Sequence, residues 1–259
     1  MFALVFVIVA LNYAPYVLWT WNASLLTLAC NFVFHVLLAL LLGSYLQCVF
    51  TDPGTVPPEW HRAVAADEQL SLEHRFDQRS QLYRPLRSHY CSVTRRIVLN
   101  MDHFCPWVVN TVGYYNRKFF VLFLLYTLAT CAWVVLTLLP GVVELPSFRA
   151  KPGVAHWGPQ RLTVVTMALL LDCALLLMLV FFGAFHVRMV LLNETTIEGH
   201  SPEYDVGYRR NWEQVMGSDP YYWFLPLWGR GPAGDGVHWP MRDFPHDSER
   251  SIDHEGKQL

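Results

Sequence analysis

The fold class is decided by residues 25–50, LLTLACNFVFHVLLALLLGSYLQCVF, an almost unbroken apolar run. A helix needs roughly 20 predominantly apolar residues to cross about 30 Å of hydrocarbon, and this run is long enough. Three further apolar segments reach a similar length, near residues 2–21, 119–143 and 162–192. The sequence therefore predicts an all-α polytopic membrane protein with four transmembrane helices.

The overall composition agrees with a bilayer environment. Of the 259 residues, 53% are hydrophobic and 15% are charged, and the mean hydropathy is positive, which is far from the usual balance of a soluble domain. The net charge of -2 and the lack of an arginine-rich block exclude a nucleic-acid-binding protein. The six cysteines form no CxxC pair, so their spacing supports neither a secreted disulfide framework nor a zinc finger.

The connections between the apolar segments predict the topology. The first segment has no basic region before it, which favours a retained helix over a cleaved signal peptide. Nine Lys and Arg residues fall in 51–118, three fall in 144–161, and seven lie from Arg188 onward. By the positive-inside rule, we expect the 51–118 loop and both termini to be cytosolic. Two large soluble pieces on one face suit an enzyme that works at the cytosolic membrane surface.

Residues with catalytic potential occur in this loop, in the heptapeptide MDHFCPW at 101–107. A free thiol with a pKa of about 8.5 is mostly protonated at neutral pH, and a neighbouring imidazole that accepts its proton generates the reactive thiolate. A carboxylate that accepts a hydrogen bond from the imidazole fixes its tautomer. The heptapeptide therefore predicts Cys105 as nucleophile, His103 as base and Asp102 as orienting acid. Alone, so short a motif is weak, and its alternative is a solvated turn.

Other motifs give the heptapeptide a context. They are Asp52-Pro53-Gly54, the stretch RPLRSHYCSV at 84–93, Asn110, Gly113, Asn116 and Phe120, the stretch TTIE at 195–198, and Tyr204, Gly207, Asn211, Trp212 and Gly217. In these ordered motifs, the chain resembles the DHHC family of protein palmitoyltransferases over most of its length. That family consists of integral membrane enzymes of eukaryotes, so the resemblance implies a multi-pass protein of an endomembrane (Golgi or ER) or of the plasma membrane.

The resemblance implies a two-step protein S-acyltransferase. Palmitoyl-CoA, an acyl-CoA co-substrate, first acylates Cys105, and the chain then passes to a cysteine of a membrane-associated target protein. Thr196 is similar to the threonine that approaches the catalytic carboxylate, and Glu198 and Asn110 are implied as supporting residues. No prosthetic group is implied.

An acyl-chain cavity is also implied, lined by Trp107, Phe120 and Phe123. Burial of a long acyl chain contributes roughly 0.8 kcal/mol per methylene, so such a cavity supplies much of the substrate affinity. The alternative for Phe120 and Phe123 is contact with membrane lipids or packing within the bundle, since aromatic residues near the head of a span are common interface anchors.

The sequence departs from the family at its zinc ligands. The family's loop binds two zinc ions, each through three cysteines and one histidine, and only Cys91 remains of the eight ligand positions. The other seven are Asp77, Ser80, Tyr90, Thr94, Ile97, Phe104 and Thr111. One thiolate cannot hold zinc, so we predict that zinc is absent. We expect the large apolar residues at three of these positions to form a miniature hydrophobic core, each contributing about 1.5–3 kcal/mol when fully buried.

Three polar residues lie within the predicted spans, namely Asn31, His35 and Asp172. We expect Asn31 and His35 to hydrogen-bond across the bundle and Asp172 to be protonated or paired, rather than to form the site. An unrelated four-span transporter or receptor would need polar residues along one pore-facing stripe, and three such residues are too few. The remaining alternative function is a catalytically silent family member that acts as a scaffold, which the intact Asp102, His103 and Cys105 disfavour.

The chain thus divides into helices at 1–50, a catalytic loop at 51–118, helices at 119–192, a TTxE and C-terminal motif region at 193–230, and a flexible tail at 231–259. The tail is rich in Gly and mixed charges and lacks periodicity. Four basic residues of the loop either bind CoA phosphates or are ordinary positive-inside charges, and they are Arg95, Arg96, Arg117 and Lys118.

Overall fold

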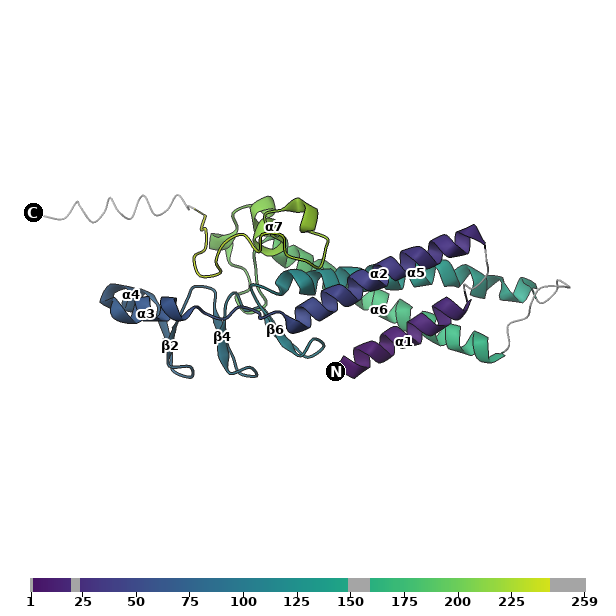
Figure 1. Cartoon of the computed structure of the whole chain (residues 1–259), viewed down its shortest axis with the longest axis horizontal. Coiled ribbons are helices and arrows are strands. Elements are labelled where there is room, and N and C mark those ends of the chain that lie inside the picture. Colours follow the sequence, from purple (N-terminus) through teal and green to yellow (C-terminus); the bar gives the residue numbers. More distant parts are fainter. Residues whose placement is uncertain (1, 20–23, 149–158, 243–259) are drawn as a thin grey trace, which may run out of the picture.

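Four long helices form one elongated bundle in the computed structural model, which describes residues 2–19, 24–148 and 159–242 (Figure 1). They are α1 (Phe2–Trp19), α2 (Leu25–Phe50), α5 (Arg117–Phe148) and α6 (Pro159–Leu191). Within the described residues, three stretches are long and apolar enough to cross a membrane, namely Leu25–Phe50, Arg117–Leu139 and Thr163–Leu191. A shorter apolar helix covers Val5–Val17. The prediction of a mostly helical membrane protein is therefore confirmed, and a fourth span stays a prediction.

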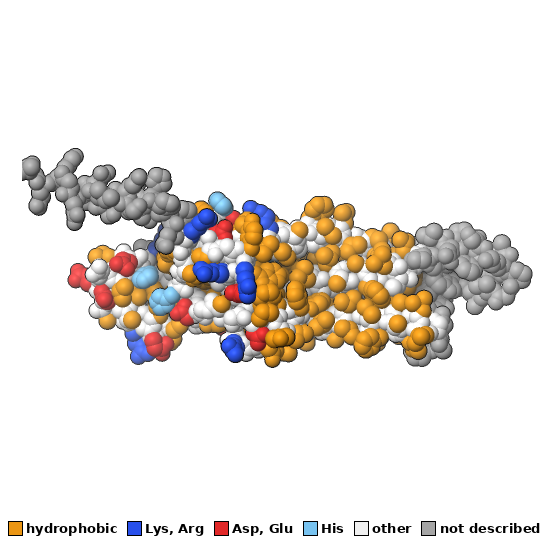
Figure 2. Space-filling view, turned by 90° about the horizontal axis from the view of Figure 1, so that it is seen from above, with side chains coloured by type: hydrophobic (Ala, Val, Ile, Leu, Met, Phe, Trp, Pro, Cys, Tyr) orange, Lys and Arg blue, Asp and Glu red, His pale blue; other side chains and the backbone are white. Residues whose placement is uncertain are grey.

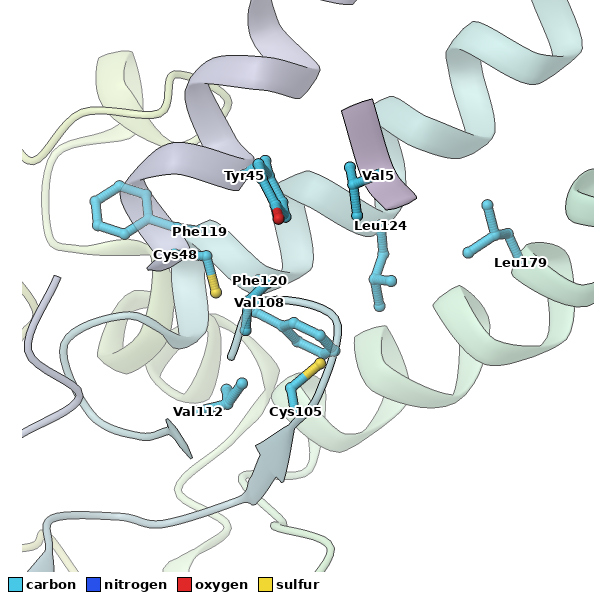
Figure 3. Packing of buried hydrophobic residues seen from close by; sticks show 10 residues of the cluster. All are labelled: Val5, Tyr45, Cys48, Cys105, Val108, Val112, Phe119, Phe120, Leu124 and Leu179. Carbon is cyan, nitrogen blue, oxygen red and sulfur yellow. The ribbon is translucent and has the colours of Figure 1, made fainter. Parts of the chain in front are cut away.

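Helix α5 lies at the centre of the bundle, because it packs against both α2 and α6, while α1 packs against α6. Apolar clusters fill the bundle at both ends. The cluster next to the loop contains Val5, Tyr45, Cys48, Cys105, Val108, Val112, Phe119, Phe120, Leu124 and Leu179 (Figure 3). The distal cluster contains Tyr16, Phe34, Val134, Leu138, Val165 and Leu169. Figure 2 shows hydrophobic side chains along the outside of the bundle and charged ones gathered over the loop end.

The loop between α2 and α5 is not helical throughout, and in this respect the all-α prediction is wrong. Two short helices, α3 (Pro58–Ala66) and α4 (Glu68–Glu73), precede three antiparallel hairpins. The hairpins are β1–β2 (Arg75–Asp77 and Leu82–Arg84), β3–β4 (His89–Cys91 and Arg96–Val98) and β5–β6 (His103–Cys105 and Asn110–Val112). Strands of three residues are too short to show an alternating pattern, so periodicity could not reveal them.

The three hairpins share one geometry and stand in a row along the loop (Figure 1). Their first strands begin at residues 75, 89 and 103, which is a repeat of fourteen residues. In each, four residues connect the strands, and the last of them is in the left-handed region, Gln81 at φ 58°, Arg95 at φ 54° and Val109 at φ 51°. The hairpin that carries the predicted catalytic residues His103 and Cys105 is therefore the third copy of one module.

The Asp52-Pro53-Gly54 motif ties this row of hairpins to the bundle. The Leu99 N–H donates to Gly54 O at 3.0 Å, and the Tyr115 N–H donates to Pro53 O at 3.1 Å. Gly113 passes directly against this motif, since a Cβ there would lie 2.6 Å from Pro53 O. Only glycine allows so close an approach of two backbones.

The C-terminal segment folds back over the loop and the base of the bundle. It contains η1 (Pro202–Tyr204), α7 (Tyr208–Met216) and η2 (Pro220–Tyr222). Part of the stretch expected to be a flexible tail contacts the loop, because Val237 is 7% exposed and packs with Ile97, Leu99 and Tyr114. A few apolar anchors between glycines hold this stretch without any periodic pattern. The remaining tail prediction, for 243–259, lies outside the described residues.

Candidate active site

The predicted catalytic residues meet on the hairpin β5–β6. In a strand, residues two apart share a face, so His103 and Cys105 lie on one face of β5 while Phe104 lies on the other. His103 Nδ1 is 2.7 Å from Asp102 Oδ2. Because Nδ1 is engaged there, Nε2 is the ring atom left for the hydrogen bond between His103 and the Cys105 thiol. The structure therefore brings all three together in the predicted order.

Asp102 is held on both carboxylate oxygens and is fully buried. Oδ1 accepts a hydrogen bond from the Thr196 N–H at 2.8 Å, and the Thr196 hydroxyl donates to the Asp102 carbonyl. Burial opposes ionisation, but the hydrogen bond from His103 and the nearby Arg117 guanidinium outweigh it and lower the pKa of Asp102 to about 2. Asp102 is therefore a fixed negative charge beneath the imidazole.

The thiol and the imidazole shift one another toward the ionised forms. Burial disfavours the charged imidazole, but the bonds to Asp102 and Cys105 raise the pKa of His103 to about 9. Burial likewise opposes the thiolate, yet His103 and the backbone N–H groups of Val108 and Trp107 lower the pKa of Cys105 below its usual value. Each group therefore favours the ionised form of the other, the thiolate and the imidazolium.

The supporting residue Glu198 acts on the loop that carries Thr196 and does not touch the three catalytic groups. Glu198 Oε2 accepts from Arg87 Nε at 2.9 Å. Arg87 is itself buried, and it donates from Nη1 to Asn193 Oδ1 at 2.8 Å and from Nη2 to Asn193 O at 2.6 Å. Glu198 therefore helps to fix the backbone on which the Thr196 N–H approaches Asp102.

Asn110 anchors the catalytic hairpin to the end of helix α2. Its Nδ2 lies 3.2 Å from Cys48 O, 3.2 Å from Val49 O and 3.1 Å from Thr51 O. The last carbonyls of a helix lack partners within the helix, so one side chain both caps α2 and places the hairpin against it. The predicted supporting role of Asn110 is structural.

An apolar cavity of about 460 Å³ opens at Cys105 and runs into the bundle between α1, α2, α5 and α6. The predicted Trp107, Phe120 and Phe123 all line it. Phe120 is 2% exposed, and its ring meets the His103 ring edge-on at 5.1 Å. Figure 3 shows the sulfur of Cys105 turned toward Phe120. Of the two interpretations of Phe120 and Phe123, the cavity wall is the one that the structure supports.

Comparison with known proteins agrees with this arrangement. The sequence profile described as DHHC palmitoyltransferase matches residues 71–203, from α4 to η1. Probable protein S-acyltransferase 12 of Arabidopsis thaliana is 36% identical over 96% of this chain and 94% of its own length. Probable protein S-acyltransferase 13 of the same plant is 38% identical over 86% and 80%. Palmitoyltransferase ZDHHC15 of Homo sapiens is 29% identical over 82% and 72%. The chain belongs to the DHHC palmitoyltransferase family.

As a DHHC-family member, the chain is an integral membrane enzyme of the acyltransferase class, and its site contains a residue that the sequence analysis missed. His186 of α6 is 2% exposed, and its Nδ1 lies 4.0 Å from Asp102 Oδ2. Its ring lies 5.8 Å from that of His103 and 4.9 Å from that of Phe120. One histidine among the apolar residues of a predicted span gave no signal except its polarity.

Of the basic residues considered for CoA phosphates, two are buried. Arg117 is 2% exposed and donates to Glu194 O at 2.5 Å, and Lys118 is fully buried, with Nζ 2.6 Å from Tyr222 O. Arg96 is paired with Asp52 at 2.6 Å. Only Arg95 of the four is exposed. Arg117 and Lys118 therefore support the fold and do not face a phosphate group.

The polar residues of the predicted spans divide into two groups. His35 Nε2 lies 3.3 Å from the Tyr13 hydroxyl of α1, which is the expected bond across the bundle, whereas Asn31 Nδ2 donates to Thr27 O within α2. Asp172 is paired with Asn12 and Cys131, as expected, but it also lines the cavity. The expectation that Asp172 lies apart from the site is therefore wrong.

The residues at the family's zinc-ligand positions do not fit a zinc ion. They bond or pair with one another, Asp77 Oδ2 with Ser80 Oγ at 2.8 Å and Cys91 Sγ with Thr111 Oγ1 at 3.2 Å. Tyr90 pairs with Ile97 and Phe104 with Thr111 across their hairpins. Among the described residues, no three His, Cys, Asp or Glu side chains are grouped to hold a metal. Zinc independence of this chain stays a prediction.

Apolar packing lies at these positions, but in two clusters and not in the single core expected. Ile97 is 4% exposed and joins Leu99, Tyr114 and Val237, with Tyr90 packed against them. Phe104 packs instead against a second cluster of Cys91, Val98 and Met101. The two clusters are separate because successive residues of a strand point to opposite faces. Tyr90 and Ile97 lie on one face of the hairpin β3–β4, and Cys91 and Val98, which pack with Phe104, lie on the other.

Proposed function

We propose that this chain transfers a long-chain acyl group, typically palmitoyl, from acyl-CoA to cysteines of membrane-associated proteins through an acyl-Cys105 intermediate. The observation that carries the proposal is the position of the Cys105 sulfur. Cys105 is hydrogen-bonded to His103 and also lines an apolar cavity. A nucleophile at the mouth of such a cavity suits a thioester whose long chain is buried in the bundle.

In the first step, the Cys105 thiolate attacks the thioester carbonyl of acyl-CoA. The C–S bond to coenzyme A breaks as the new C–S bond to Cys105 forms, and the CoA thiolate leaves. The imidazolium of His103 supplies the proton to that leaving sulfur. Asp102, buried and ionised, stabilises the imidazolium until this transfer and keeps the ring in place.

In the second step, neutral His103 accepts the proton of a target cysteine thiol. The target thiolate attacks the acyl-Cys105 carbonyl, and the Cys105 thiolate leaves. His103 is then protonated and Cys105 ionised, as at the start of the first step. The two shifts in pKa described above therefore suit a cycle in which His103 donates a proton in one half and accepts one in the other.

The topology of the proposal follows the charge distribution of the connections. We propose that α1 is a fourth span, that the loop and both termini are cytosolic, and that the chain resides in a eukaryotic endomembrane (Golgi or ER) or the plasma membrane. The hairpins and the C-terminal segment lie together at one end of the bundle (Figure 1), as two soluble pieces on one membrane face require.

The test is acyl-CoA labelling of the purified full chain in lipid nanodiscs. Palmitoyl-CoA is expected to label the native chain with a hydroxylamine-labile thioester, and Cys105→Ser is expected to take up none. The matched control is Cys91→Ser, which changes the equivalent cysteine of the neighbouring hairpin and is expected to keep the label. An unchanged label in Cys105→Ser contradicts the assignment. No label in the folded native chain favours the silent scaffold instead.

A further inference from the structure

The cavity is apolar along its length but polar at its far end. There it is lined by Asn12 of α1, Asp172 of α6, and Thr130 and Cys131 of α5. Asp172 is 1% exposed. Its Oδ2 and the Asn12 Oδ1 have no hydrogen-bond partner within the described part of the chain. Buried polar atoms without partners are rare and costly, above all in a membrane, so this pair requires an explanation.

The rest of each side chain is fixed in place. Asn12 Nδ2 donates to Ile8 O at 3.1 Å, and Asp172 is hydrogen-bonded to Asn12 and Cys131. Thr130 donates back to Tyr126 O at 2.7 Å within its own helix. What remains free are one amide oxygen, which accepts, and one carboxyl oxygen, which accepts when ionised and donates when protonated. A hydroxyl inside the cavity complements both oxygens in either state, because it can donate and accept.

The depth of this polar end matches a particular part of an acyl chain. Phe182 and His186 of α6 lie beside the catalytic pair, through ring contacts with Phe120 and His103. A helix rises about 1.5 Å per residue, which places Asp172 about 15–21 Å farther along α6. A zigzag of C–C bonds of about 1.5 Å advances roughly 1.25 Å per carbon, so this depth corresponds to about carbons 12 to 17 of a chain on Cys105.

We infer that Asn12 and Asp172 form a subsite for a hydroxyl group near the end of the acyl chain, so that long-chain hydroxyacyl-CoA is a preferred substrate class. This inference rests on the proposed function and names the substrate of the same site. The hydroxyl donates to Asp172 Oδ2 or Asn12 Oδ1, both of which an unsubstituted chain leaves without a partner. A chain that ends in a carboxylate places a second anion or acceptor against Asp172 and is excluded.

The experiment measures acylation of Cys105 in the purified full chain from mixtures of CoA thioesters. The probes are palmitoyl-CoA, 16-hydroxypalmitoyl-CoA, 2-hydroxypalmitoyl-CoA and the CoA ester of hexadecanedioic acid, and mass spectrometry of the Cys105 peptide gives each ratio. The 16-hydroxy chain is expected to be used in preference to palmitoyl. The 2-hydroxy chain carries the same group beside the thioester, so it is expected to gain nothing.

The variants assign any preference to the subsite. Asp172→Leu is expected to lower the ratio of 16-hydroxypalmitoyl to palmitoyl by about tenfold or more, the usual effect of an unpartnered buried donor. Cys173→Leu is the matched control, because Cys173 is the next residue of α6 and is exposed outside the cavity. Its ratio is expected to equal that of the native chain. Asp172→Asn keeps the size of the side chain and is expected to admit the carboxylate-ended chain.

Three results overturn the inference. One is an equal ratio in the native chain and Asp172→Leu, which shows that the oxygens are satisfied without the substrate. The second applies where Asp172→Leu fails to fold. In this result, Asp172→Asn excludes the carboxylate-ended chain as strongly as the native chain does. The third is a native chain that takes no label from any of the four thioesters, and in that case the proposed function fails as well.

Discussion

Two neighbouring hairpins carry the same three-residue pattern, and only one of them lines the cavity in the bundle. Strand β3 reads His89-Tyr90-Cys91 and strand β5 reads His103-Phe104-Cys105. Both are followed by four connecting residues, both pair in the same register, and both cysteines are buried. The pKa of each thiol is lowered against the effect of burial by hydrogen bonds. A lowered thiol pKa therefore does not by itself distinguish the two hairpins.

The difference lies in what each hairpin meets. Cys91 accepts a hydrogen bond from Thr111 at 3.2 Å inside the loop, whereas Cys105 lies on the wall of the cavity. His89 faces Glu198 at 3.5 Å, a carboxylate that already pairs with a buried arginine, while His103 has Asp102 at 2.7 Å. Of these two hairpins, β5–β6 is the one that places its cysteine against the cavity of the bundle.

The largest effect is expected from the carboxylates that face the two histidines. Asp102→Asn removes the charge that holds the imidazolium, so single-turnover acylation of Cys105 at neutral pH is expected to fall about 10³-fold or more. Glu198→Gln makes the same change opposite His89, and its loss of rate is expected to be much smaller because Glu198 touches none of the catalytic groups. Equal losses from the two substitutions, in proteins with native melting temperatures, contradict the assignment of roles.

Substitutions of the two histidines are expected to differ in how they change the pH dependence of acylation. In the native chain the pKa of Cys105 is lowered and that of His103 is about 9, so the rate of acylation is expected to fall as pH decreases through the Cys105 pKa. His103→Ala is expected to cost about 100-fold at pH 7, and less as pH rises above the ordinary thiol pKa of about 8.5. His89→Ala is expected to leave the pH profile unchanged. A native profile in His103→Ala disproves its role as base.

Packing in the two hairpins differs at equivalent positions of their second strands. Ile97 is 4% exposed and packs with Val237, so Ile97→Ala is expected to lower the free energy of unfolding by about 2–4 kcal/mol. Thr111 occupies the same place in β6 and bonds to Cys91, so Thr111→Ala is expected to cost about 1 kcal/mol. Thermal melting in nanodiscs checks both. A larger loss from Thr111→Ala shows that apolar packing is not the support of this loop.

The smallest difference concerns the turns. Val109 has φ 51° with a β-branched side chain that is 46% exposed, while Arg95 has φ 54° with an unbranched one. Such a conformation is strained for valine above all, so Val109→Gly is expected to stabilise the chain by about 0.5 kcal/mol. Arg95→Gly is expected to change stability little. The comparison is read from melting temperatures, and a destabilised Val109→Gly shows that this turn is not strained.

The proximity of Asp102, His103 and Cys105 in the fold could be predicted, because they are close together in the sequence. Asp102, His103 and Cys105 span four positions, and the spacing of His103 and Cys105 already places them on one face of a strand. Phe120 and Phe123 were identified only through the family resemblance. The structure then decided between a cavity wall and a lipid-facing surface, which depends on how the helices turn about their axes.

The rest depends on contacts between distant segments, for which the sequence gives no periodic signal. His186 is near Asp102 only because α6 returns beside the catalytic hairpin. Arg117 and Lys118 look like surface charges at the head of a span, yet backbone carbonyls from later segments bury them. Trp239 belongs to a stretch expected to be flexible, yet Arg87 Cζ lies over its ring, 4.5 Å from the ring centroid. Each of these positions is set by tertiary packing alone.

The position of Trp239 against Arg87 has a consequence for biosynthesis. Arg87 and Cys105 leave the ribosome about 130 to 150 residues before Trp239, which corresponds to on the order of ten seconds of translation. During that interval the Asn193–Glu198 segment and Trp239 are not yet there to complete the surroundings of Arg87 and to support the contact of Thr196 with Asp102. The residues that hold Asp102 and Arg87 in place are therefore made well after Cys105, His103 and Asp102 themselves.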